Sequence, residues 1–193
     1  STDQWFIGVD HQLKSTNKSL RDMSLDSIKS DINFYPDAGK ARLYGMLETR
    51  PDWCISRQRS WGLPIPAFQD SNGNILLTGN SVRSIAKIIQ SDGSDAWFRK
   101  TAQELLANYD PHQDNQAPKN FDIQSAEKLN DIFDVWFESG SSWYAVIKSR
   151  QNHDISDLYL EGSDQHRGWF HLSLLPSLAV NKRPPFKSVL THG

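Results

Sequence analysis

Polar residues crowd one short turn of the sequence, between an apolar strand and the helix expected after it. Leu158–Leu160 should form the strand, Glu161 to Ser163 follow, and the helix should begin near Asp164. In open α/β sheets, ligands bind at the carboxyl ends of the strands, and the free N–H groups of a helix start favour anions or hydroxyl oxygens. Glu161 could therefore hold a cation or an ammonium group, and Asp164 could accept hydrogen bonds from a ribose.

Each of these features also has a purely structural interpretation. Gly162 lets a backbone approach a ligand closely, but Ser163 or Asp164 could do no more than cap the helix, since both residue types are common N-caps. Trp136 and Trp169 both lie near strand-to-helix junctions. They could line an apolar pocket at the edge of the sheet, or they could be ordinary core residues, as large aromatic residues usually are.

Other chemistry-bearing residues give weaker signals. Lys40, Arg57 and Arg59 could touch a phosphate, although isolated basic residues are usually solvated surface. The six histidines show no metal-ligand spacing with cysteine or carboxylate partners, so no metal site is expected. The sequence lacks the GxxxxGK[ST] and GxSxG patterns, which removes the P-loop and hydrolase-elbow interpretations.

The elements around the polar turn predict an α/β fold with a parallel sheet. Residues 132–137 and 188–190 are expected to be strands, and the helix from Asp164 should bend or break at Pro176. A strand, a helix and a strand within about 35 residues is the size of a βαβ unit. Earlier in the chain, helices are expected around 20–28 and 43–47, with an extended segment at 32–36.

Residues 69–130 have the character of a separate insert. A hairpin turn is predicted at 71–74, and a helix at 81–91 with Ser81 as its N-cap and Gly93 as its stop. Thr101 and Glu104 form a capping-box pattern, and residues 108–120 are typical of a surface loop.

Composition limits the possible classes of function. The 21 basic and 23 acidic residues of this 193-residue chain nearly cancel, which argues against a protein that binds polyanions over its whole surface. Cys54 is the only cysteine, which excludes an intrachain disulfide and fits a reducing compartment. No apolar run approaches the roughly 20 residues of a membrane span, and no signal-peptide pattern is present. We therefore expect a cytoplasmic protein without membrane contact.

Three blocks of the sequence resemble the isoleucyl-tRNA synthetase family of the class I aminoacyl-tRNA synthetases. They are WCISRQR at 53–59 with the following WG and PIP, DVWFESG at 134–140, and YLEGSDQHRGWF at 159–170. The first block also occurs in looser form in the valyl and leucyl relatives. Gln4 to Phe6 resembles the family's exit from its editing domain, so the resemblance spans essentially the whole chain.

The resemblance also shows what this sequence lacks. It has neither the family's His-Ile-Gly-His motif nor its Lys-Met-Ser-Lys-Ser loop, and Glu138 stands where the family commonly has aspartate. We therefore expect a central fragment, inactive alone, with a partial Rossmann-like nucleotide-binding fold and a small α+β insert. Residues 1–50 would be the return segment from the editing insert. Residues 51–68 and 131–193 would belong to the catalytic domain, and 69–130 would be a connective insert.

The resemblance implies roles in a parent isoleucine–tRNA ligase. The parent, expected to be monomeric, would activate isoleucine with ATP and Mg²⁺ and transfer it to tRNA(Ile). No catalytic residue and no tightly bound cofactor or metal would lie in this fragment. The implied adenylate-binding residues are Glu161, Gly162, Asp164, Gln165 and His192, with His192 beside the adenine; the implied isoleucine-pocket residues are Trp136 and Trp169; the implied tRNA contacts are Arg57 and Arg59.

Three alternatives stay open. The chain could be a non-catalytic tRNA-positioning module that acts through Lys14, Lys18, Arg57 and Arg59. It could also derive from the valyl or leucyl relative. A nucleotide-binding domain unrelated to synthetases would have to match residues 53–66 by accident.

Overall fold

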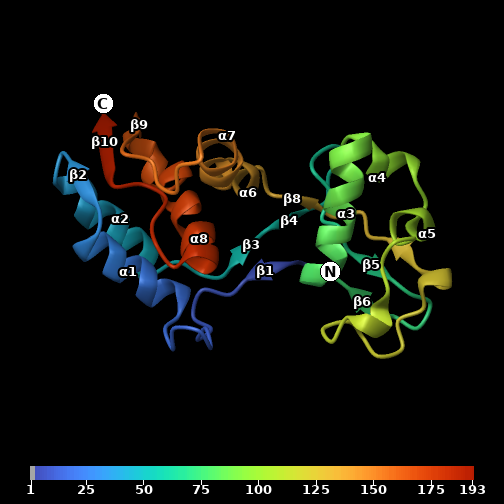
Figure 1. Ribbon diagram of the computed structural model, residues 1–193. Helices are drawn as coiled ribbons and strands as arrows, with labels where there is room; N and C mark the ends of the chain where they lie inside the picture. Colours follow the sequence, from blue (N-terminus) through green and yellow to red (C-terminus); the bar gives the residue numbers. More distant parts are fainter. Residues whose placement is uncertain (1–2) are drawn as a thin grey trace. The chain divides into compact units, whose positions relative to one another are not determined.

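The structure, a computed structural model, describes residues 3–193, which form two compact units (Figure 1). The first unit contains the described residues up to Arg57 together with Phe133–Gly193, and the second unit is Gln58–Ile132. The short strands β4 (Ser56–Arg57) and β8 (Ile132–Phe133) lie where the chain passes from one unit to the other.

A parallel three-stranded sheet organises the first unit. The strand order is β2 (Asn33–Tyr35), β10 (Ser188–His192) and β9 (Tyr159–Gly162). Both pairings of β10 are parallel. Helix α8 (Trp169–Asn181) connects β9 to β10, which confirms the predicted strand–helix–strand unit and the α/β class.

Helices pack around this sheet and enclose one apolar core. They are α1 (Leu20–Ser30), α2 (Ala38–Glu48), α6 (Val135–Gly140), α7 (Ser149–Gln151), α8, the 3₁₀ helix η4 (Ser163–His166) and the π-helical turn η3 (Trp143–Lys148). The fully buried members of the core include Leu43, Phe170, Leu174 and Val189. The antiparallel pair β1 (Phe6–Ile7) and β3 (Trp53–Cys54) belongs to the same unit.

Helix α8 is apolar on most of its sides, as expected of a helix buried in a core. It continues through Pro176, so the predicted break does not occur. A Cβ at Gly140 would collide with the carbonyl oxygen of Leu172. Helices α6 and α8 therefore approach each other at backbone contact, and only glycine fits at this point.

The second unit has its own sheet and its own core. Strand β5 (Phe68–Gln69) pairs antiparallel with both β6 (Ile75–Leu76) and β7 (Glu127–Lys128). The helices are α3 (Gly79–Asp92), α4 (Ala96–Arg99), α5 (Ala102–Leu105), and the 3₁₀ turns η1 (Pro111–Gln113) and η2 (Ile123–Ser125). Phe68, Ile85, Trp97 and Leu105 are buried together. The predicted hairpin and the Thr101–Glu104 capping box are both confirmed.

Two sequence-based predictions of element boundaries in the first unit are wrong. Residues 132–137 are not one strand, because Asp134 caps a helix: its side chain accepts a hydrogen bond from the Trp136 N–H, and α6 begins at Val135. The long helix does not begin near Asp164 either. A 3₁₀ turn occupies Ser163–His166, and α8 begins at Trp169 after a non-helical Gly168.

One predicted cap in the second unit is also wrong. Thr78, not Ser81, is the N-cap of α3. The Thr78 hydroxyl accepts a hydrogen bond from the Ser81 N–H, and the Ser81 hydroxyl accepts one from the Thr78 N–H. This reciprocal arrangement is a capping box that starts the helix two residues earlier than predicted.

Candidate functional site

The carboxyl ends of β9 and β10 bring three predicted site residues to one edge of the sheet. His192 is the register partner of Gly162, and Thr191 is the partner of Glu161. The side chains of Glu161 and His192 are both exposed. A Glu161 carboxylate oxygen accepts a hydrogen bond from the Gly162 N–H at 3.1 Å. A carboxylate, a glycine backbone and an imidazole therefore meet at the sheet edge where ligands bind in α/β folds.

The turn η4 adds the two remaining polar residues to this edge. The Gln165 side-chain amide donates to an Asp164 carboxylate oxygen at 3.0 Å, and its oxygen accepts from the Trp169 N–H at 2.9 Å. Gln165 therefore both orients Asp164 and caps α8. The alternative that Ser163 or Asp164 merely caps the helix is wrong, since neither side chain accepts a hydrogen bond from the start of α8 or η4.

Close packing fixes Asp164 and Trp136 against two glycines. A Cβ at Gly162 would lie 2.8 Å from an Asp164 carboxylate oxygen. A Cβ at Gly168 would lie 2.8 Å from the Trp136 ring and 2.5 Å from the Gln165 side-chain oxygen. Trp136 is 36% exposed and covers Gly168. The fold thus places Trp136 beside Gln165, although the two residues are far apart in the sequence.

Trp169 is held from three sides. Its ring stacks on Tyr159 with centroids 3.8 Å apart and 7° between the planes. Its indole N–H donates to the Ser139 carbonyl and the Ser142 hydroxyl, both at 3.1 Å. The residue is partly buried against the first unit's core. Trp169 therefore takes part in the packing of the core, and its partly exposed surface leaves it open to a pocket role as well.

The two arginines predicted to contact tRNA occupy different environments. The Arg57 guanidinium is bound to the protein itself: it pairs with Asp134 at 3.0 Å and donates to the carbonyls of Cys54 and Ser56 at 2.9 and 2.7 Å. Arg59 belongs to the second unit, is exposed, and lines a cavity of about 310 Å³ together with Phe98.

Asp134 is the positioning residue that the sequence analysis missed. Its buried carboxylate accepts from the Trp53 indole N–H at 3.0 Å and from the Trp136 N–H at 3.3 Å, and it pairs with Arg57. One side chain thus connects the block at 53–59 to the start of α6. An aspartate directly before the first residue of a helix is an N-cap signal, and this signal was available in the sequence.

His171 is a buried titratable group behind the site. Burial lowers the pKa of His171 to about 3, and the nearby positive charge of Arg50 acts in the same direction. Its Nδ1 lies 3.2 Å from the His166 carbonyl oxygen, so Nδ1 carries the proton of a neutral ring. Its Nε2 is buried without a partner within the described chain.

Residues 3–193 contain neither a candidate metal-binding cluster nor a candidate membrane-spanning helix. No three histidine, cysteine or carboxylate side chains in this range come together as a metal site would require. None of the helices in the same range has the length and apolar character needed to cross a membrane.

Comparison with known proteins places the chain in a family. The family described as tRNA synthetases class I (I, L, M and V) matches residues 1–193, so the chain belongs to the class I tRNA synthetases.

Individual relatives point to one member of this family, the isoleucine–tRNA ligases. The isoleucine–tRNA ligase of Nitratiruptor sp. is 48% identical over 200 residues, covering 100% of this chain and 20% of that protein. The isoleucine–tRNA ligase of Acinetobacter baylyi is 45% identical over 196 residues, covering 100% and 19%. The chain thus spans about a fifth of the length of these relatives. Among solved structures, a ternary complex of Agrobacterium radiobacter LeuRS with tRNA and LeuAMS aligns at a TM-score of 0.44 and 17% identity, over 74% of this chain and 19% of that one.

Proposed function

We propose that this chain is the central part of an isoleucine–tRNA ligase, which activates isoleucine with ATP and transfers it to tRNA(Ile). The observation that carries the proposal is the edge formed by β9, η4 and β10. There His192 is the register partner of Gly162, Glu161 is the preceding residue of β9, and Asp164 and Gln165 follow in η4. The high identity to isoleucine–tRNA ligases over the whole chain supports isoleucine over leucine or valine.

Each residue of the edge has a chemical role in this proposal. The Glu161 carboxylate and the backbone of Gly162 contact the aminoacyl-adenylate. Asp164 accepts hydrogen bonds from the ribose or the amino group, and Gln165 orients it. His192 lies beside the adenine. Trp136 and Trp169 wall the apolar side-chain pocket, and Trp136 reaches that position because Gly168 leaves room for its ring.

The remaining parts of the proposal concern the whole protein. The substrates are isoleucine, ATP with Mg²⁺, and tRNA(Ile), and the parent is a cytoplasmic monomer. Residues 1–50 return from the editing insert, and 69–130 form a connective insert. We propose Arg59 as a tRNA contact. We also propose Arg57, whose ion pair to Asp134 competes with such a contact.

Chemistry at this edge requires groups that the chain lacks. Activation is attack of the isoleucine carboxylate on the α-phosphate of ATP, which forms the adenylate and releases pyrophosphate. Preorganised positive groups at the phosphates usually supply the largest share of catalysis, and the family's two missing motifs provide them. The 193-residue chain alone should therefore show no isoleucine-dependent ATP–pyrophosphate exchange.

The encoding reading frame tests this proposal. It must contain His-Ile-Gly-His upstream and Lys-Met-Ser-Lys-Ser downstream of the present sequence. The purified product of that frame should catalyse isoleucine-dependent exchange, and Glu161→Ala in it should strongly weaken exchange without unfolding the protein. Near-normal exchange by the Glu161→Ala variant would refute the role of Glu161, and absence of the two motifs would refute the proposal as a whole.

A further inference from the structure

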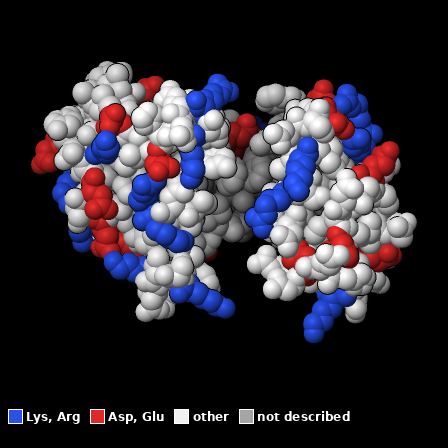
Figure 2. All heavy atoms as spheres, in the orientation of Figure 1, with Lys and Arg blue, Asp and Glu red and all other residues white. Residues whose placement is uncertain are grey.

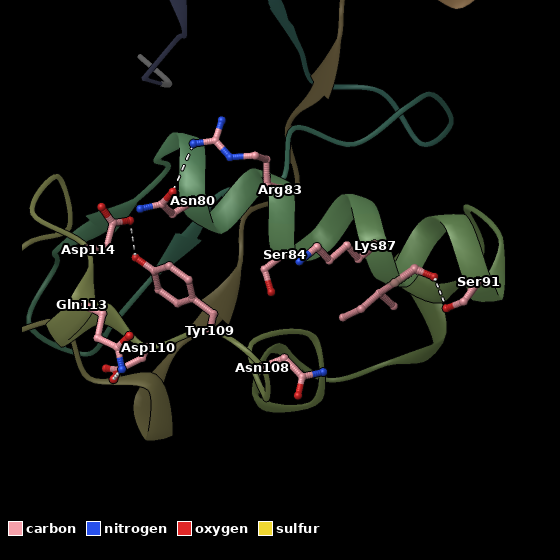
Figure 3. A pocket seen from close by; sticks show the side chains of 11 residues that line it. Asn80, Arg83, Ser84, Lys87, Ser91, Asn108, Tyr109, Asp110, Gln113 and Asp114 are labelled. Atoms are coloured by element: carbon pink, nitrogen blue, oxygen red, sulfur yellow. Dashed lines mark hydrogen bonds between the residues drawn. The ribbon is translucent and has the colours of Figure 1, made fainter. Parts of the chain in front are cut away.

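A polar cavity in the second unit is lined by none of the residues assigned above. Helix α3 and the segment 108–114 enclose about 650 Å³, a volume within the roughly 300–1,000 Å³ typical of ligand pockets. Figure 3 shows the side chains that line this space, with the Tyr109 hydroxyl directed toward Asp114. Arg83 and Lys87 line it from the helix, and Asp110 and Gln113 from the segment.

The acidic groups of the cavity are already engaged within its wall. Asp110 accepts hydrogen bonds from the His112 N–H and the Gln113 side chain, both at 2.9 Å. Buried Asp114 accepts from the hydroxyls of Thr78 and Tyr109. Burial, together with the Asp114 bond, raises the pKa of Tyr109 to about 12, so the phenol stays protonated and remains a donor. These bonds fix the shape of the 108–114 segment.

The two basic side chains of the cavity form no ion pair with the described residues that would neutralise their charge. Arg83 donates to the neutral side-chain oxygen of Asn80 at 3.1 Å and forms no ion pair with any other described residue. Lys87 has no hydrogen bond or ion pair within residues 3–193. The two residues are four apart in α3 and therefore lie on one face of the helix. A guanidinium group and an ammonium group at this spacing can both donate hydrogen bonds to the oxygens of one phosphate.

We propose that this cavity binds one nucleotide of an RNA chain, with its phosphodiester on Arg83 and Lys87 and its ribose and base against Asn108 and Gln113. The side-chain amides can both donate to and accept from a 2′-hydroxyl and a base edge. This inference rests on the proposed function, in which the RNA is tRNA. Acidic and basic side chains are interspersed over the face shown in Figure 2, so contact with RNA must be local rather than spread over the surface.

Binding of a labelled tRNA(Ile) transcript to the 193-residue chain tests the proposal. The variant Arg83→Glu with Lys87→Glu should raise the dissociation constant about tenfold at 0.1 M salt and reduce the salt slope by about 1 or more, because phosphate contacts are lost. The matched control is Arg42→Glu with Lys119→Glu, which makes the same charge change at exposed residues outside the cavity. Unchanged far-UV circular dichroism confirms that both variants fold.

The outcomes separate this site from the proposed function. A loss of binding as large in the control as in the cavity variant overturns the site, as does the absence of tRNA binding by the unmodified chain. If millimolar AMP displaces the transcript from the unmodified chain and no longer binds the Arg83→Glu, Lys87→Glu variant, the cavity is a free-nucleotide site and the RNA proposal is overturned. None of these results affects isoleucine-dependent exchange by the full reading frame, which is the test of the proposed function.

Discussion

Replacing Asp134 by alanine should destabilise the first unit because three separate interactions end on this one carboxylate. The indole N–H of Trp53, a residue that is 3% exposed, would be left buried without a partner, at a cost of about 1–3 kcal/mol. Loss of the N-cap of α6 costs about 0.5–2 kcal/mol. The Arg57 side chain is about one-third exposed, so water can solvate its charge in the variant. Loss of its ion pair therefore adds little to the loss of stability. Together these losses predict a free energy of unfolding lower by about 3 kcal/mol.

Urea unfolding followed by tryptophan fluorescence measures this change. Asp134→Asn keeps one acceptor oxygen and should lose roughly half as much. Asp37→Ala is the matched control, because Asp37 stands at the N-cap of α2 without a side-chain hydrogen bond; its loss should stay within about 0.5 kcal/mol. An Asp134→Ala variant as stable as the Asp37→Ala control would refute the claim that Asp134 connects the block at 53–59 to α6.

Two further predictions concern the interior of the first unit. The pKa of His171 is lowered to about 3 in the folded state, compared with its ordinary value of about 6.5. The stability contributed by the neutral ring is therefore intact above pH 6.5 and is lost as the pH falls toward 3. At pH 5, the free energy of unfolding should be lower by about 2 kcal/mol for this reason. His171→Gln should therefore lose about 2 kcal/mol less than the unmodified chain between pH 7.5 and pH 5 in urea unfolding, and an identical pH dependence would contradict the assignment. Gly140→Ala should lower the free energy of unfolding by about 2 kcal/mol or more, because its methyl group meets the Leu172 carbonyl oxygen. Gly45→Ala, in open space on α2, should instead stabilise by about 0.5–1 kcal/mol, and equal effects at the two glycines would rule out the close approach of α6 and α8.

Local signals in the sequence predicted much of the fold. The Asn-Gly turn and the capping box act within a few residues, so the hairpin at 71–74 and the start of α5 follow from the sequence directly. The apolar pattern of 132–137 suits a strand or a buried helix equally, and only the N-cap signal of Asp134 within the run distinguishes the two. The side-chain bond of Asp134 decided in favour of the helix.

The candidate site was predictable only in part, for the same reason. Parallel strand ends gather at one edge of a sheet, so the meeting of Glu161 and His192 was within reach of sequence reasoning. The packing of Trp136 on Gly168 joins two distant segments, and no local pattern announces it. The start of α8 was predicted too early, because a 3₁₀ turn occupies Ser163–His166 and the Gln165 side chain accepts the first N–H of α8, that of Trp169.

The most direct test of the proposed site is calorimetric titration of the 193-residue chain with a non-hydrolysable isoleucyl-adenylate analogue. The account predicts weak but measurable binding, because half of the site is present. This binding should be at least fivefold weaker in Glu161→Ala and unchanged in Glu48→Ala, which removes an exposed carboxylate at the end of α2. It should also be stronger for the isoleucyl than for the leucyl analogue. Equal binding by the Glu161→Ala and Glu48→Ala variants, or no binding at all by the unmodified chain, would contradict the account.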